Sequence, residues 1–276
     1  MPELPEVETV RRSIAKNIEG KRITGVCMRH AGVLQHPKCD IAAFSQALEN
    51  KTIKKISRRG KYLFFTFYED EHYLVLHLRM TGKLLWLKER EVEHVHRHVI
   101  LTLSDKSFLI YDDVRRFGGF SYYTPKEYAC LCDRLGPEAC DTAFSPEYLF
   151  LATRNRRIPI KSLLLNQSVV AGLGNIYVDE ILFASGIRPK KSARRLSKKE
   201  CAKIAHSSQN ILQEAIRAGG SSIRDYRDGS GKKGSFQLQH KVYGRANKPC
   251  MTCGTNLRSC LVSGRTSVYC PMCQKS

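Results

Sequence analysis

Four cysteines near the C-terminus form two CxxC pairs. Cys250 and Cys253 make the first pair, and Cys270 and Cys273 make the second after 16 intervening residues. A CxxC segment bends so that both sulfurs reach one ion, and two pairs at this spacing are typical of a tetrahedral four-thiolate zinc site. Because four thiolates close the coordination shell, we expect one structural Zn²⁺ that stabilises a tail with little core of its own.

The other seven cysteines follow no such spacing. The total of eleven is odd and no secretory signal is recognisable, so we expect reduced thiols that are buried or have no role. A second metal pair formed by Cys130 and Cys132 is an alternative. The seven are Cys27, Cys39, Cys130, Cys132, Cys140, Cys201 and Cys260.

The second residue of the chain offers a different kind of chemistry. Removal of Met1, which a small following residue favours, would leave Pro2 as a free secondary amine. An α-amino group titrates near ~7.7 to 8.0, so a useful fraction is unprotonated at neutral pH. Attack of this amine on a sugar C1′ gives an iminium ion that drives elimination of the flanking phosphates, and Glu3 is placed to act as the acid. The residues alone leave open a second interpretation, in which this segment is only the entry to a helix.

An α+β fold must position these groups. Apolar residues recur at helical intervals over residues 5–18, which predicts one N-terminal helix. Short runs of β-branched and aromatic residues follow over 21–124 between polar or Gly-containing turns, and they predict a β-sandwich. Five helices are expected after Pro125, over residues 125–135, 146–153, 160–168, 175–185 and 197–218.

The predicted domain boundary lies at Thr124–Pro125 or in the region up to Pro146. Residues 219–235 are rich in Gly, Ser and charged side chains, which predicts a mobile loop.

A glycine-containing turn precedes one of the predicted helices. Gly172 and Gly174 permit close backbone approach, and the free N–H groups of the helix that starts at Asn175 can hold a phosphate. An ordinary helix after a C-cap is the alternative for an isolated GLGN segment.

The composition indicates a polyanionic partner. Lys and Arg exceed Asp and Glu by 20, and the pI is about 9.6. A polyanion releases its condensed counterions when a basic protein binds, and this release favours binding. The candidate partners are therefore nucleic acid and anionic membranes. No apolar run approaches the ~20 residues of a membrane span. We therefore expect a cytoplasmic protein that binds nucleic acid and no membrane.

Six ordered blocks and the cysteine motif resemble the bacterial formamidopyrimidine-DNA glycosylases, of the formamidopyrimidine glycosylase and endonuclease VIII family. The resemblance spans essentially the whole chain. The blocks are PELPEVETVRR (2–12), RRGKYL (58–63), HLRMTG (77–82), RRFG (115–118), AGLGNIYVDEILF (171–183) and VYGR (242–245).

This resemblance implies a two-domain enzyme of base-excision repair that removes 8-oxoguanine and formamidopyrimidines from duplex DNA and cleaves the abasic strand by β,δ-elimination. The implied parts are an N-terminal catalytic β-sandwich domain (1–124), a helix-two-turn-helix domain (125–240) and a zinc-finger hairpin (241–276). The implied partner is double-stranded DNA with oxidised purines or abasic sites, bound by a monomer.

The resemblance also implies roles for single residues. Pro2 is the Schiff-base nucleophile, Glu3 protonates the opening sugar, and Lys61 assists β-elimination. Arg265 matches the position assigned to δ-elimination and phosphate contact. Without the resemblance, Lys61 and Arg265 are ordinary solvated charges.

Seven further residues match DNA contacts of the family. Met80, Arg115 and Phe117 match the side chains that fill the gap left by a flipped base, a task that suits apolar surface and a guanidinium. Core packing is the alternative for Met80 and Phe117, and a solvated charge is the alternative for the basic residues. Of the remaining four, His96, Arg157 and Asn175 match contacts to the DNA backbone, and Lys161 matches a position near the base pocket.

Two positions bear on the family assignment, and the first departs from the family pattern. Val114 stands where the family usually has Pro, which predicts a looser loop before RRFG. Leu4 stands where the endonuclease VIII branch has Gly, which favours the branch that acts on purines.

Two rival functions remain at this point. One is a non-catalytic zinc-finger protein that binds damaged DNA, and the other is a basic zinc protein that acts on RNA. The complete set of Pro2, Glu3 and Lys61 favours the enzyme, because a pure binder has no need of it.

Overall fold

A computed structural model describes residues 2–36, 40–89, 94–223 and 225–275. Contacts between residues divide the chain into two compact units. The first comprises Met1–Asp133 and Ala218–Ser235, and the second comprises Arg134–Arg217 and Phe236–Ser276. Met1, Cys39 and one residue of the 219–235 loop lie outside the described residues.

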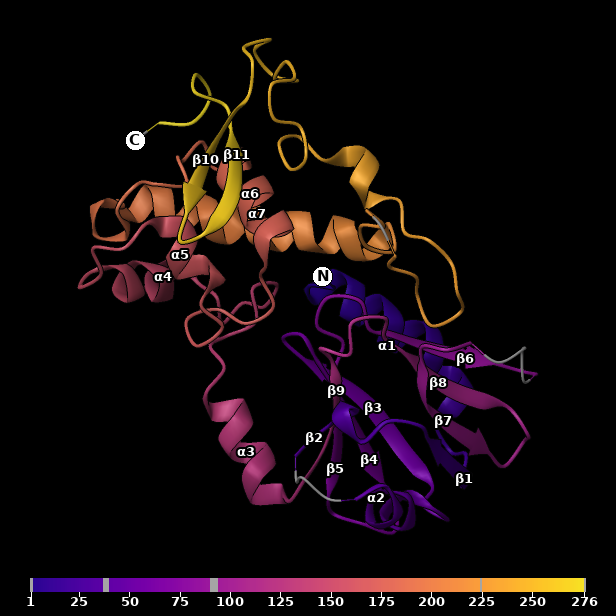
Figure 1. Cartoon of the computed structure of the whole chain (residues 1–276). Helices are drawn as coiled ribbons and strands as arrows, with labels where there is room; N and C mark the ends of the chain where they lie inside the picture. The colour runs from indigo at the N-terminus through magenta and orange to yellow at the C-terminus, as the bar shows by residue number, and fades with distance from the viewer. Residues whose placement is uncertain (1, 37–39, 90–93, 224, 276) are drawn as a thin grey trace. The chain divides into compact units, whose positions relative to one another are not determined.

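The first unit is a β-sandwich that is flanked by helices (Figure 1). Its four-stranded sheet has the order β1-β7-β8-β6 and is antiparallel, whereas the five-stranded sheet has the order β2-β9-β5-β4-β3 with β2 parallel to β9. The strands are β1 (Ile23–Met28), β2 (Leu34–His36), β3 (Ile53–Arg59), β4 (Tyr62–Phe67), β5 (Tyr73–His77), β6 (Lys83–Leu87), β7 (Arg97–Leu103), β8 (Phe108–Asp112) and β9 (Gly119–Tyr123).

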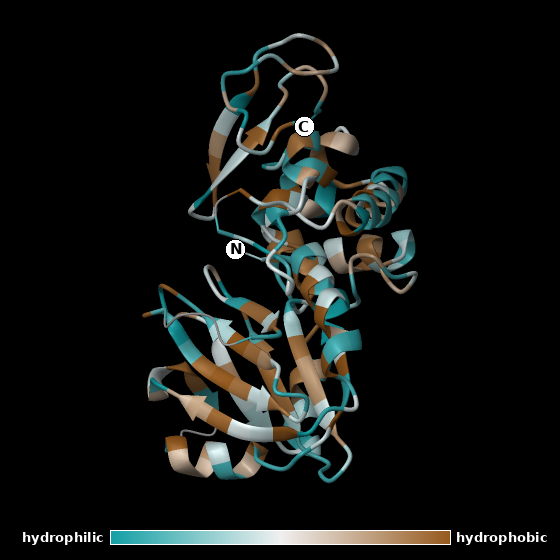
Figure 2. Ribbon diagram, turned by 90° about the vertical axis from the view of Figure 1, so that its right-hand side faces the viewer, coloured by the Kyte–Doolittle hydropathy of each residue, from teal (hydrophilic) through white to brown (hydrophobic). Residues whose placement is uncertain are grey.

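The sandwich core follows from alternation along the strands. Leu63, Phe65 and Phe67 of β4 belong to the buried apolar cluster, while the residues between them face the other side of the sheet. Figure 2 shows brown, hydrophobic stretches along the strands of the first unit. The helix α1 (Leu4–Ile18) adds Val7, Val10, Ile14 and Ile18 to the same cluster.

Two helices of the first unit differ from the prediction. The helix α2 (Ile41–Leu48), which is capped by Asp40, lies within a region predicted only as β-rich. The helix α3 (Pro125–Asp133) joins the first unit because Tyr128 stacks on Tyr73 at 3.8 Å and meets the edge of Phe64. The division by contacts thus falls at residue 133, and the three-part division at 124 and 240 stays a prediction.

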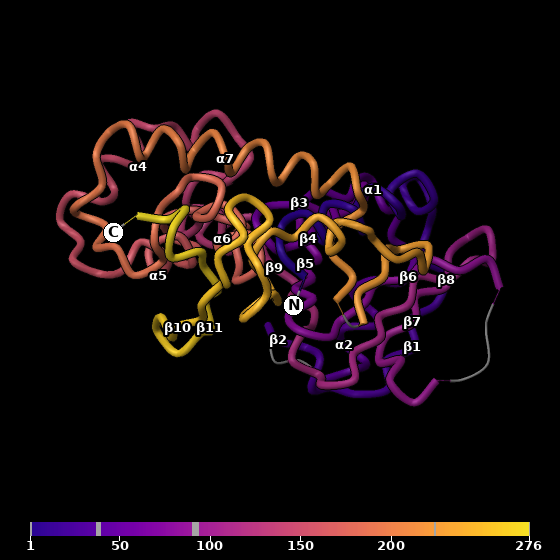
Figure 3. Tube along the Cα trace, turned by 90° about the horizontal axis from the view of Figure 1, so that it is seen from above, coloured from indigo at the N-terminus to yellow at the C-terminus, as the bar shows by residue number. Residues whose placement is uncertain are grey.

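The second unit consists of helices and one β-hairpin. Its long helix α7 runs beside α4 (Figure 3). The hairpin strands pair in antiparallel register from Arg258 opposite Tyr269 to Val262 opposite Arg265. The elements are α4 (Pro146–Thr153), α5 (Ile160–Leu165), α6 (Asn175–Ala184), α7 (Lys198–Arg217), β10 (Arg258–Val262) and β11 (Arg265–Tyr269). Among the described residues, short 3-10 helices span Ala31–Val33 in the first unit and Ala193–Arg195 and Phe236–Gln239 in the second.

Candidate functional site

The N-terminal residues are held by a capping box at the start of α1. Glu3 is the N-cap, its side chain faces the N–H of Glu6, and Glu6 Oε2 accepts the N–H of Glu3 at 2.8 Å. Pro5 occupies the first turn, where its missing N–H costs no helical bond. Pro2 is buried and Glu3 is 2 % exposed, so both lie in the interior of the folded chain rather than in a free tail.

Glu6 also binds the segment predicted to be mobile. Its Oε1 accepts the N–H of Ser221 at 2.7 Å, and the Tyr226 hydroxyl donates to the carbonyl of Glu6 at 3.2 Å. Further along, the N–H of Gly229 donates to Ser13 Oγ at 2.8 Å. Hydrogen bonds from Ser221, Tyr226 and Gly229 therefore hold the segment 218–235 against α1. Sequence reasoning missed Glu6, because only its spacing of three from Glu3 marks it.

Lys61 follows the tight turn between β3 and β4. Gly60 there has a φ of 57°, and Arg58 Nη1 donates to its carbonyl at 3.0 Å. Arg58 also pairs with Glu8 of α1 at 3.1 Å. Burial alone would raise the pKa of Glu8, but hydrogen bonds from Arg11 and Arg12 lower it to about 2.

The chain of contacts from Glu8 through Arg58 to Gly60 ties the turn that carries Lys61 to α1. Lys61 itself is 6 % exposed, so the expectation of a merely solvated lysine does not hold.

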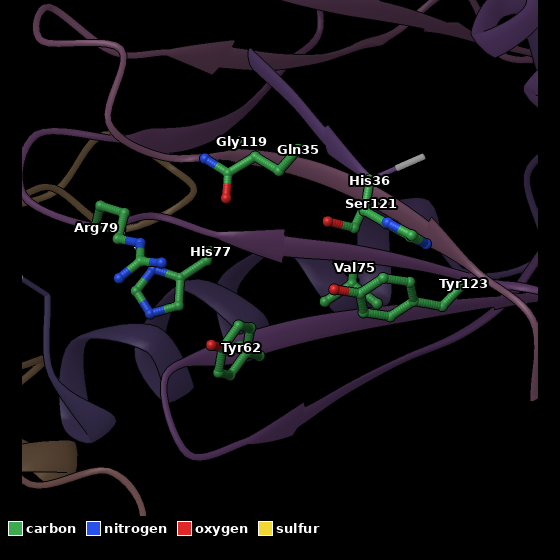
Figure 4. Close-up of a pocket in the computed structure, with 9 residues that line it drawn as sticks. All are labelled: Gln35, His36, Tyr62, Val75, His77, Arg79, Gly119, Ser121 and Tyr123. Atoms are coloured by element: carbon green, nitrogen blue, oxygen red, sulfur yellow. Dashed lines mark hydrogen bonds between the residues drawn. The ribbon is translucent and has the colours of Figure 1, made fainter. Parts of the chain in front are cut away.

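A small polar pocket opens on the face of the five-stranded sheet that points away from the core (Figure 4). Tyr62, His77 and Arg79 line it, and the rings of Tyr62 and His77 meet edge to face at 4.6 Å. His77 Nδ1 accepts the N–H of Arg79 at 2.9 Å. Burial and the charges of Arg79 and Lys61 lower the pKa of His77 to about 3. His77 is thus a neutral donor through Nε2 at neutral pH, a feature that the HLRMTG block did not reveal by itself.

Met80, Arg115 and Phe117 form one exposed group, called here the wedge cluster. The Arg115 guanidinium lies 4.3 Å from the centre of the Phe117 ring, and its Nη1 is 3.3 Å from the sulfur of Met80. Met80 is 45 % exposed and Phe117 is 49 % exposed. The structure therefore does not place either apolar residue in the sandwich core.

His96 lies beside the same loop. It precedes β7, and its carbonyl accepts the N–H of Asp113 at 3.0 Å. Its half-buried ring meets that of His94 edge to face at 5.3 Å.

In the second unit, the start of α6 is joined to the hairpin. Gly174 is the N-cap of α6, and Gly172 has a φ of 97° that favours glycine. Asn175 Nδ2 donates to the carbonyl of Thr266 at 3.1 Å. The adjacent Arg265 is exposed and follows Ser263 and Gly264, which both have positive φ and close the hairpin.

Lys161 lies inside the second unit. It is fully buried, and its Nζ donates to Asp179 Oδ1 at 2.7 Å and to the carbonyl of Thr266 at 3.1 Å. Burial raises the pKa of Asp179 to about 6, against the opposing effect of Lys161. In this structure the Lys161 ammonium binds the hairpin backbone from inside the second unit. Arg157, in contrast, is exposed on the loop between α4 and α5.

The C-terminal cysteines lie together. The sulfurs of Cys250 and Cys273 are 3.9 Å apart, those of Cys253 and Cys270 are 3.5 Å apart, and all four lie within 4.8 Å of one another. This donor set fits a metal ion with a closed shell. Among the described residues no other His, Cys, Asp or Glu group is arranged in this way, Cys130 and Cys132 included.

A further buried carboxylate binds the segment that precedes this cysteine cluster. Glu180 of α6 accepts the N–H groups of Lys241, Val242 and Tyr243 at 2.8 to 3.0 Å. Sequence reasoning missed it, because its partners lie some sixty positions away.

Comparison with known proteins decides the family. The chain is 43% identical to the formamidopyrimidine-DNA glycosylase of Bacillus subtilis, over 99% of each chain. The chain belongs to the formamidopyrimidine-DNA glycosylase family. The protein of the same name from Desulforamulus reducens is also 43% identical, over the full length of both chains. The family's N-terminal domain matches residues 1–120, and its H2TH domain matches residues 135–227.

Solved structures of this family share the fold. A Lactococcus lactis Fpg mutant in complex with Fapy-dG-containing DNA has a TM-score of 0.92, with 36% identity and full coverage of both chains. The Lactococcus lactis Fpg in complex with abasic-site DNA has a TM-score of 0.91, with 36% identity over 99% of this chain and all of the other. The predicted α+β class with a helix-two-turn-helix domain is confirmed. Of the helices described, none has the length and apolar character to cross a membrane.

Proposed function

We propose that this chain removes oxidised purines, namely 8-oxoguanine and formamidopyrimidines, from duplex DNA and then cleaves the abasic strand. The family membership carries this proposal. Related structures that hold Fapy-dG or abasic-site DNA support the formamidopyrimidine and abasic substrates, and 8-oxoguanine follows from the family resemblance. Residues of the first unit, together with Arg265 of the second unit, supply the chemistry. DNA with these lesions is the proposed partner of a monomer in the cytoplasm.

Pro2 begins the reaction as a nucleophile. After removal of Met1, its nitrogen lone pair forms a bond to C1′ while the bond from C1′ to the base breaks. The departing base takes up the N–H proton of Pro2. Glu3 then protonates the sugar oxygen O4′ as the bond from C1′ to O4′ breaks, which leaves an iminium ion at Pro2. The iminium withdraws electrons, so that loss of a C2′ proton expels the 3′ phosphate with help from Lys61, and a second elimination near Arg265 expels the 5′ phosphate.

The wedge cluster and three polar or basic residues hold the DNA. We assign Met80, Arg115 and Phe117 to the gap left by the flipped base, because they form one exposed group with apolar surface and a guanidinium donor. His96, Arg157 and Asn175 are assigned to backbone phosphates. Lys161 is left out of this interface, since its ammonium is fully buried.

The cysteine cluster is assigned to one structural Zn²⁺. Four thiolates hold the ion and leave no open position, so the metal stabilises the hairpin that presents Arg265 and takes no part in bond cleavage. The proposed domains are the catalytic sandwich (1–124), the helix-two-turn-helix region (125–240) and the zinc hairpin (241–276).

Covalent trapping tests the proposed chemistry. Incubation with an 8-oxoguanine duplex and borohydride should reduce the iminium and leave a covalent adduct at Pro2, and Edman sequencing of the free protein should begin at Pro2. Pro2→Gly should sharply lower strand cleavage on both 8-oxoguanine and abasic duplexes. An intact duplex with strong binding would favour the non-catalytic zinc-finger protein instead, and unchanged nicking by Pro2→Gly would remove Pro2 from its role.

A further inference from the structure

The wedge cluster is built from two separate loops of the first unit. Met80 lies in the turn from Leu78 to Gly82, and Arg115 and Phe117 lie in the loop between β8 and β9. Because about half of each apolar side chain is exposed, core packing does not fix their positions. Something else must hold the two loops in one arrangement.

Asp113 contacts both loops through one fully buried carboxylate. Its Oδ1 accepts the hydroxyl of Thr81 and the N–H of Arg115, the latter at 3.2 Å. Its Oδ2 accepts the hydroxyl of Tyr111 at 3.0 Å and the N–H of Gly118 at 2.9 Å. Thr81 adjoins Met80, so all three wedge residues are next to or part of the segments that Asp113 binds.

The space around this carboxylate is closed. A Cβ on Gly118 would lie 2.2 Å from the Tyr111 hydroxyl and 2.9 Å from the carbonyl of Leu78 in the other loop, and a Cβ on Gly82 would lie 3.0 Å from the same Tyr111 hydroxyl. These distances are shorter than van der Waals contact, so the two loops meet at their closest possible approach. The arrangement leaves one geometry for both loops.

We propose that Asp113 is the positioning residue of the wedge cluster. It keeps Met80 of one loop against Arg115 and Phe117 of the other, so that a single preformed wedge fills the gap when the damaged base leaves the stack. This inference rests on the proposed function of the wedge cluster. Asp113 acts through its neighbours and touches neither the lesion nor the sugar.

The carboxylate chemistry of Asp113 is essential to this role. In Asp113→Asn one oxygen becomes an NH2 group, which cannot accept a hydrogen bond. The hydroxyls of Thr81 and Tyr111 can turn to accept from it, but a backbone N–H cannot. In either orientation of the amide, its NH2 group therefore faces the N–H of Arg115 or the N–H of Gly118, and that backbone N–H loses its acceptor.

The test compares excision of 8-oxoguanine from a duplex with cleavage of a preformed abasic site, each in single turnover. Base extrusion matters for the first substrate and much less for the second. Asp113→Asn should lower the ratio of the two rates about tenfold, the effect of losing hydrogen bonds to a charged group. Thr81→Val removes the hydroxyl that donates to Asp113 and accepts the N–H of Arg115 at 3.3 Å, but it keeps the carboxylate. It should lower the same ratio by less, and Phe117→Ala serves as the standard for a damaged wedge.

Asp112→Asn is the matched control. Asp112 is also buried and adjoins Asp113, but its Oδ2 faces His94, and among the described residues its Oδ1 has no hydrogen-bond partner. This variant should keep the wild-type ratio, even if its melting temperature falls. Wild-type ratios in both Asp113→Asn and Thr81→Val would overturn the role of Asp113. If Asp113→Asn does not fold, a wild-type ratio in Thr81→Val is sufficient to overturn it. A wild-type chain that cleaves neither duplex would overturn the proposed function and this inference together.

Discussion

Three buried carboxylates each hold the backbone of another segment. Burial of a carboxylate is costly unless hydrogen bonds compensate, and N–H groups that point at a charged oxygen make the stronger kind of hydrogen bond. Glu6 binds the segment 218–235, Asp113 binds the loop of the wedge cluster, and Glu180 binds the segment that precedes Cys250. The pairs are Glu6 with Ser221, Asp113 with Arg115 and Gly118, and Glu180 with Lys241, Val242 and Tyr243.

The neutral ring of His77 should make the protein sensitive to acid. Its pKa is lowered from 6.5 to about 3, so between these values the unfolded chain binds a proton that the folded chain does not. Stability is therefore complete above the unfolded pKa and is lost as the pH falls, by up to about 1.4 kcal/mol per pH unit. In His77→Asn, Oδ1 can still accept the N–H of Arg79, but this titration is absent.

Urea unfolding at several pH values tests this effect. Between about pH 6.5 and 4 the free energy of unfolding of His77→Asn should fall less steeply than that of the wild type. The other acid-sensitive groups, such as Glu8 with its pKa of about 2, are common to both proteins and cancel in the comparison. If the free energy of unfolding falls equally steeply with pH in both proteins, the titration of His77 does not cause the loss of stability in acid.

At the scale of elements, local periodicity predicted what neighbouring residues determine. The helix predicted over 5–18 is α1 (Leu4–Ile18), and the cysteine spacing predicted the cluster, because in both cases the signal lies within a few residues. The short helix α2 was missed between β-rich runs, and the buried pair of Lys161 could not be inferred from an isolated lysine. Contacts such as that of Glu6 with Ser221 join residues 215 positions apart, and no local pattern encodes them.

The turn at Val114 should accept the proline that the family usually has there. Arg116 donates its N–H to the carbonyl of Asp113 at 3.2 Å, so Val114 is the second residue of a β-turn, where proline is favoured. Among the described residues the N–H of Val114 has no hydrogen-bond partner that proline would remove. The Asp113 carboxylate already orders this loop, so the sequence-based expectation of a looser loop loses its basis.

Val114→Pro should accordingly raise the free energy of unfolding by about 0.4 to 1 kcal/mol, because it restricts the unfolded chain. The ratio of 8-oxoguanine excision to abasic cleavage should stay at the wild-type value. Thermal unfolding followed by circular dichroism gives the first quantity and single-turnover assays give the second. A marked loss of stability would show that the turn needs a φ that proline does not adopt.

The metal should be a condition for the hairpin to fold. The buried apolar cluster of this region contains few residues besides its own cysteines, whereas a structural zinc ion contributes ~10 to 16 kcal/mol in isolated modules. Chelation or Cys250→Ser should therefore unfold β10 and β11 and abolish DNA binding. Trp86, the sole tryptophan of the chain, reports on the sandwich, and its fluorescence should not change.

Cys260→Ser is the control for the metal experiment. Cys260 lies on β10 of the same hairpin but outside the four-sulfur cluster, so this variant should bind metal and DNA as the wild type does. Full DNA affinity after complete metal removal would contradict the structural role.

At the scale of the whole molecule, net charge and lesion choice have separate origins. The formal charge of +20 attracts any duplex, because each neutralised phosphate releases condensed counterions regardless of base sequence. The choice of a damaged base must come from groups that meet the base or its gap, such as the wedge cluster. Of the residues that contribute to this charge, an exposed arginine such as Arg157 can neutralise a phosphate, but the buried Lys161 cannot.

Salt titration separates a phosphate contact from the general field. The logarithm of the association constant falls with the logarithm of salt concentration by about 0.9 per neutralised phosphate, so Arg157→Gln should reduce the slope by about 1. Lys106→Gln removes the same charge from an exposed residue in the turn that precedes β8, at the opposite end of that strand from the wedge loop. It should lower affinity slightly and leave the slope near that of the wild type. Fluorescence anisotropy with a duplex that carries a stable abasic-site analogue, between about 50 and 200 mM salt, gives both slopes. Equal slopes for Arg157→Gln and the wild type would mean that Arg157 adds to the overall charge without touching a phosphate.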